Sequence, residues 1–131
     1  MAKKPPNPVA ADLIAQLDRK LAPLGHIATR RMFSGYGAYL DGVVFALILR
    51  GRLWLRVDDA TRPDFVKAGM KPFAYTQTRS GKVIRVESYY ECPAAVLGDG
   101  AKLRRWVKEA RRASAERNKK KPAKRKPADG L

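Results

Sequence analysis

The sequence has one cysteine and one histidine among its 131 residues. A single cysteine excludes an internal disulfide, and a catalytic zinc site needs about three ligands drawn from His, Cys and carboxylates. Cys92 and His26 stand alone in different segments, so we expect no metal and no cofactor. No helix N-terminus is predicted beside Cys92 to activate its thiol for nucleophilic catalysis. The sequence predicts a partly buried inert thiol, a surface imidazole and a protein that is not an enzyme, with a site built from Tyr, Arg and Asp left open as the alternative.

Long hydrophobic runs are also missing. No apolar stretch approaches the roughly 18 residues that a membrane-spanning helix requires. The N-terminal stretch MAKKPPNPVA contains prolines where a secretory signal has a continuous apolar region. We therefore expect a cytoplasmic protein with no membrane partner.

Acidic residues are scarce: 28 Lys and Arg face 12 Asp and Glu, for a net charge of +16. The excess is uneven, because residues 101–131 carry 13 basic and 3 acidic residues, a net of +10. The end of this segment has prolines between its cations and nothing to bury, which predicts a disordered basic tail over 115–131. A polyanion such as DNA is its natural counterpart, bound without sequence preference. A passive solubilising tail is the alternative.

The candidate nucleic-acid-binding residues are the cations of the last predicted helix and of this tail. We predict that the following side chains contact phosphates: Arg104, Arg105, Lys108, Arg111, Arg112, Arg117, Lys119, Lys120, Lys121, Lys124, Arg125 and Lys126. No helix-turn-helix pair, zinc finger or basic zipper is visible, so direct base readout is not expected.

Hydrophobic periodicity predicts an α+β fold. Helical spacing of apolar residues indicates a first helix over 8–22 and a last helix that begins after Asp99, with Trp106 in its apolar stripe. A short helix over 62–68, with Thr61 as its cap, separates two groups of strands. The predicted order is α-β(3)-α-β(2)-α, an antiparallel sheet packed with helices. Residues 1–7 are expected to form a disordered arm, and 8–114 a single domain.

The first group of strands is marked by glycines. We expect one strand over 27–40 with a bulge or sharp bend near Gly35 and Gly37, then strands over 43–49 and 53–57. Asp41-Gly42 and Arg50-Gly51 are the turn signals between them. The Gly35-Tyr36-Gly37 stretch lacks the third glycine of a phosphate-binding loop, so its glycines are interpreted as structural. The second group has strands over 73–77 and 83–90.

Four segments of the sequence resemble the N-terminal domain of the TfoX, or Sxy, competence-regulator family over about residues 10–113. These segments are RRMFSGYG at 30–37, YLDGVVFALI at 39–48, LWLRVD at 53–58 and SYYECP at 88–93. The resemblance implies a fold like that of type III secretion chaperones. It also implies a role as a transcriptional co-activator in competence together with the cAMP receptor protein, and it transfers no catalytic residue.

Two functions follow as hypotheses. The first is a small regulatory protein whose folded domain meets a protein partner while its tail binds DNA non-specifically. The second is a protein-only adaptor or chaperone-like binding module with a passive tail.

Overall fold

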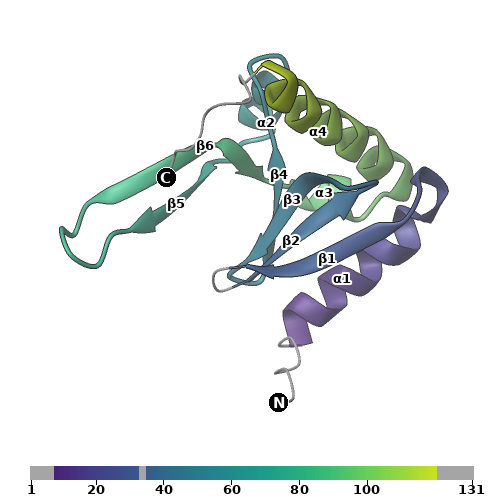
Figure 1. Cartoon of the computed structure of the whole chain (residues 1–131), viewed down its shortest axis with the longest axis horizontal. Coiled ribbons are helices and arrows are strands. Elements are labelled where there is room, and N and C mark those ends of the chain that lie inside the picture. The colour runs from purple at the N-terminus through teal and green to yellow at the C-terminus, as the bar shows by residue number, and fades with distance from the viewer. Residues whose placement is uncertain (1–7, 33–34, 121–131) are drawn as a thin grey trace.

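The computed structural model describes residues 8–32 and 35–120. These residues form a six-stranded antiparallel sheet with helices packed on one of its faces (Figure 1). The elements in chain order are α1 (Pro8–Lys20), the 3-10 helix η1 (Ala22–Leu24), β1 (Ile27–Met32), β2 (Gly35–Leu40), β3 (Val43–Leu49), β4 (Arg52–Arg56), α2 (Arg62–Lys67), β5 (Pro72–Thr76), β6 (Val83–Glu91), α3 (Ala94–Leu97) and α4 (Gly100–Lys120). The predicted α+β class is confirmed.

The strands lie in the order β1-β2-β3-β4-β6-β5. Strands β1 to β4 form a meander, and β6 then pairs with β4 so that β5 becomes the second edge strand. Figure 1 shows α1 and α4 on the same side of the sheet, with the β5–β6 hairpin projecting away from both helices.

The first group has four strands where the sequence predicted three. The single bent strand expected over 27–40 is two strands, β1 and β2, which pair antiparallel from Ile27 opposite Leu40 to Met32 opposite Gly35. Gly35 begins β2 at a close approach to β3, where a Cβ atom would overlap the backbone carbonyl oxygen of Ile48 and the side chain of Leu49. The glycine interruption therefore marks the start of a strand and not a bend within one.

The two predicted turns are confirmed by their backbone angles. Asp41 and Gly42 have φ of 51° and 82°, and Arg50 and Gly51 have φ of 55° and 73°. Two successive residues with positive φ make the two-residue hairpin turn whose twist matches that of the flanking strands.

The main core lies between the helices and the inner face of the sheet. Its largest fully buried side chains come from α1 and the residue that follows it, and from β3, β4 and α4. They are Leu17, Leu21, Phe45, Ile48, Leu55, Leu103 and Val107. Alternation along β4 directs Leu53 and Leu55 into this core.

The opposite face of the sheet carries a smaller cluster, and we call this face the outer face. Its buried residues are Leu49, Trp54, Phe73 and Tyr89, and all four belong to strands. Trp54 and Phe73 meet edge to face, with 5.1 Å between ring centroids. No helix residue of the described chain belongs to this cluster.

Helix α4 is longer than the predicted domain boundary at 114 allows. The Asp99 carboxylate accepts the N–H groups of Ala101 (3.0 Å) and Lys102 (3.2 Å), as a helix cap does, and the helix runs to Lys120. The helix therefore extends past the expected boundary at 114, and its packed stripe includes buried Ala113 and Ser114. Residues 1–7 and 121–131 lie outside the described residues.

Candidate functional site

Five of the predicted phosphate-binding cations lie along the packed part of α4, and three of them make bonds inside the protein. Arg104 donates to the backbone carbonyl oxygen of Lys20 at 3.1 Å, and Arg111 donates to that of Leu40 at 3.0 Å. These bonds fasten α4 to the end of α1 and to the end of β2. The sequence pattern indicated a solvent-facing stripe, whereas these arginines reach sideways to carbonyls on neighbouring elements.

Arg112 is the most strongly paired of the five. Its guanidinium donates to Asp58 (3.1 Å), Glu109 (2.9 Å) and Glu116 (3.0 Å). The hydrogen bond to Asp58 and then that to Glu109 raise the pKa of Arg112 above its usual range. A guanidinium that already holds three carboxylates has little capacity left for a phosphate.

Asp58 is the one partner of Arg112 among these three that lies outside α4. It accepts the N–H groups of Ala60 (3.1 Å) and Thr61 (3.0 Å), while the Thr61 hydroxyl accepts the N–H of Asp58 at 3.1 Å. The predicted capping box is therefore displaced: Thr61 pairs with Asp58 and makes no side-chain cap to α2. Burial raises the pKa of Asp58, but the hydrogen bonds from Arg112 and Thr61 outweigh it, so that pKa lies below its usual value.

Of these five cations, Arg105 and Lys108 face solvent. Both are exposed, and neither makes an ion pair or a side-chain hydrogen bond within residues 8–32 and 35–120. Arg117, Lys119 and Lys120 belong to the last turns of the same helix. The remaining predicted cations, Lys121, Lys124, Arg125 and Lys126, lie outside the described residues.

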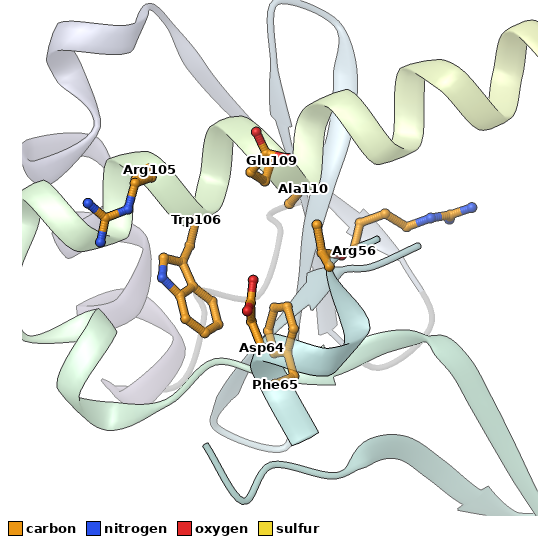
Figure 2. Close-up of a pocket in the computed structure, with 8 residues that line it drawn as sticks. Arg56, Asp64, Phe65, Arg105, Trp106, Glu109 and Ala110 are labelled. Atoms are coloured by element: carbon orange, nitrogen blue, oxygen red, sulfur yellow. The ribbon is translucent and has the colours of Figure 1, made fainter. Parts of the chain in front are cut away.

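A cleft of about 230 Å³ separates α2 from α4, lined by Arg56, Thr61, Asp64, Phe65, Arg105, Trp106, Glu109 and Ala110. Figure 2 shows the Trp106 indole and the Phe65 ring at its centre, and the guanidinium groups of Arg56 and Arg105 on opposite sides. The two rings meet edge to face at 4.7 Å. Trp106, predicted as a core residue, is half-buried at the margin of the core. The cleft is smaller than the roughly 300 to 1,000 Å³ of typical small-molecule sites.

Cys92 was predicted to be a partly buried thiol and His26 a surface imidazole. Cys92 is buried, and its burial raises the pKa of the thiol to about 12, so it stays protonated at neutral pH. His26 is exposed. Within the described part of the chain no group of three or more His, Cys, Asp and Glu side chains is arranged to hold a metal ion. A helix long and apolar enough to cross a membrane is also missing from this part.

Sequence reasoning missed the arginines of the outer face. Arg50 lies 5.1 Å from the centroid of the Phe73 ring, Arg56 lies 5.3 Å from that of Tyr89, and Arg30 lies 5.4 Å from that of Tyr39. The alternation of Arg52, Trp54 and Arg56 along one strand was the available signal, since residues two apart share a face.

Residues 19–114 match the family described as the TfoX N-terminal domain. No curated protein matches the chain. The matched segment starts in α1 and ends in α4, so it contains the whole sheet, the cleft and the packed half of the last helix. The chain belongs to the TfoX N-terminal domain family.

Proposed function

We propose that this protein is a cytoplasmic, non-enzymatic regulator whose folded domain binds a protein partner while its C-terminal cations add non-specific affinity for DNA. The family is of a competence or regulatory type and is not a known enzyme family. By the same resemblance, a transcription regulator such as the cAMP receptor protein is the proposed partner.

One observation carries the DNA-binding part of the proposal: the sequence concentrates cations beyond the packed half of α4. Residues 117–126 contain seven cations and no carboxylate. The cations of the packed half are mostly committed to carbonyls and carboxylates, as Arg104, Arg111 and Arg112 illustrate. Phosphate contact is therefore assigned chiefly to the end of the chain, with Arg105 and Lys108 as lesser contributors.

The test is the salt dependence of binding to duplex DNA. If about five of the seven cations engage phosphates, log affinity falls against log salt with a slope of about −4 to −5. A tail variant with Lys121, Lys124, Arg125 and Lys126 each changed to Gln removes two to four of these five contacts, so it should flatten the slope by about 2 to 4 at about 0.9 per contact. Duplexes of different sequence should bind equally, because phosphate contacts read no bases.

The matched control changes four exposed cations elsewhere, Lys67, Lys71, Arg79 and Lys82, to Gln. It has the same length and net charge as the tail variant and should keep the original slope. Equal flattening in both variants would show that total charge matters and not the C-terminal end.

The second candidate function, a protein-only adaptor, is favoured by the internal bonds of the α4 arginines and by the outer face that no described helix covers. No measurable duplex binding at low salt would reject the DNA part and leave this adaptor as the function.

A further inference from the structure

Arginine side chains cover part of the outer face of the sheet. The planar guanidinium groups of Arg50 and Arg56 lie over the rings of Phe73 and Tyr89, and these rings belong to the buried outer cluster. Phe73 is 9% exposed and Tyr89 8%, although no described helix lies over them. The arginines therefore occupy the position that a helix layer occupies on the inner face.

The strand register places these groups in one continuous surface. Arg30, Gly37, Leu47, Trp54 and Glu91 lie opposite one another across β1, β2, β3, β4 and β6. Residues opposite one another in a sheet share a face, so this row crosses the outer face from its β1 edge to β6. Leu47 is half-buried and gives the row an apolar centre.

The charge of this surface is positive. Arg52 forms an ion pair with Glu91, with 2.9 Å between Nη1 and Oε2, and the Arg52 side chain is still 60% exposed. Arg30, Arg50 and Arg56 make no ion pair within residues 8–32 and 35–120. Arg50 donates to the Ala74 carbonyl oxygen at 2.8 Å and Arg56 to the Tyr89 hydroxyl at 3.5 Å. Each guanidinium has further N–H donors for a carboxylate or phosphate, and its place over an aromatic ring restricts its rotamers.

We propose that the outer face is a docking surface for an acidic segment of a partner protein, with carboxylates on Arg30 and Arg56 and an apolar side chain on Leu47. This inference rests on the proposed function, because it states the chemistry of the partner that the folded domain binds. Aromatic residues and arginine around a desolvated apolar centre are the composition of protein interfaces.

Charge and burial exclude the other occupants. The segments of this chain outside the described residues are themselves basic: residues 1–7 contain Lys3 and Lys4, and residues 121–131 contain four cations and one carboxylate. A second copy would oppose arginine with arginine. Single-stranded nucleic acid binds by stacking bases on several open rings. The rings of Trp54, Phe73 and Tyr89 are more than nine-tenths buried, and Tyr75, which is 39% exposed, lies on edge strand β5, at the opposite edge of the sheet from Arg30.

The test measures binding of a fluorescently labelled synthetic peptide of alternating glutamate and leucine to the full chain. The double variant Arg30→Gln and Arg56→Gln should weaken binding roughly tenfold, the effect of about 1.4 kcal/mol shared by two charged contacts. The matched control is Arg105→Gln with Lys108→Gln, which removes the same charge from the exposed side of α4 and should change affinity less than about twofold. Equal weakening in both variants overturns the proposal.

Two further measurements keep the result independent of folding and of DNA. The variant Trp106→Phe leaves Trp54 as the only tryptophan and changes no residue of the outer face. Binding of the peptide should change the fluorescence emission of Trp54. Unchanged Trp54 emission at saturating peptide would overturn the docking site. Displacement of the peptide by duplex DNA in the tail variant would reassign the face to nucleic acid. Tail-dependent DNA binding without peptide binding would reject this inference and leave the DNA part of the proposed function standing.

Discussion

Replacing Asp58 tests how the start of α2 is fastened to α4. Its carboxylate accepts two backbone N–H groups with Oδ1 and an Arg112 N–H with Oδ2. The change Asp58→Asn keeps an oxygen for the backbone groups and removes the charge that faces Arg112. The change Asp58→Ala removes both, so the two variants separate the backbone hydrogen bonds from the ion pair.

The expected losses differ in size for a structural reason. The Asp58 side chain is 31% exposed and Arg112 keeps Glu109 and Glu116 when Asp58 is neutral, so Asp58→Asn should lower the free energy of unfolding by only about 1 kcal/mol. Loss of the two backbone hydrogen bonds should add about 1 kcal/mol, for a total of about 2 kcal/mol in Asp58→Ala. Asp59→Asn is the control, because Asp59 is 98% exposed and its change should cost less than about 0.5 kcal/mol.

Urea unfolding at several pH values measures these losses. The folded-state pKa of Asp58 is depressed below 3.8, so its contribution is fully present above that value and is lost as pH falls through the folded-state pKa. The difference between the wild-type protein and Asp58→Asn should therefore shrink in acid. A difference that stays constant as the pH falls from neutral into acid, or an equal loss in Asp59→Asn, would refute the assigned ion pair.

Three further predictions concern the packing of the domain. Gly35→Ala should lower the unfolding free energy by about 1 to 3 kcal/mol, because its Cβ would meet the Ile48 backbone. Gly100→Ala is the control in the same melting curves and should be nearly neutral, since its Cβ meets only the guanidinium end of Arg104, at 3.3 Å. Cys92 should react with a thiol reagent only as fast as the protein unfolds, because burial raises its pKa to about 12; rapid labelling of the native chain would contradict this. A chain ending at Arg112 should be about 1 to 2 kcal/mol less stable than one ending at Lys120, because it lacks buried Ala113 and Ser114; equal urea midpoints would contradict the packing of this part of α4.

Local signals predicted the parts of the fold that local physics determines. Asp41-Gly42 and Arg50-Gly51 predicted their turns because positive φ at two successive residues strongly restricts the residue types. The apolar spacing of α4 predicted its buried stripe at Leu103 and Val107. The division of 27–40 into two strands was not predicted because glycine in a β-rich segment is compatible with a bulge, a bend or a strand boundary. What the sequence did not show at Gly35 is its close approach to β3, which lies elsewhere in the sequence.

The candidate site was harder to predict because a charge pattern does not specify its partners. Helical spacing placed Arg104 and Arg111 outside the apolar stripe, but it did not indicate that each reaches a carbonyl about 70 to 85 positions away in the sequence. The outer face was missed for a related reason. Its arginines come from β1, the β3–β4 turn and β4, and only the strand register brings them together.

Several arginines of this domain donate hydrogen bonds inside the protein, and each such bond leaves fewer N–H donors for a polyanion. Arg50, Arg104 and Arg111 donate to backbone carbonyl oxygens at 2.8, 3.1 and 3.0 Å. In the case of Arg50 the carbonyl belongs to Ala74 on edge strand β5, where an open strand would otherwise pair with another chain. A count of cations thus overstates the phosphate-binding capacity of the folded part. After the C-terminal cations are neutralised, the slope of affinity against salt should reflect free side chains such as Arg105 and Lys108, and not the full positive charge of the domain.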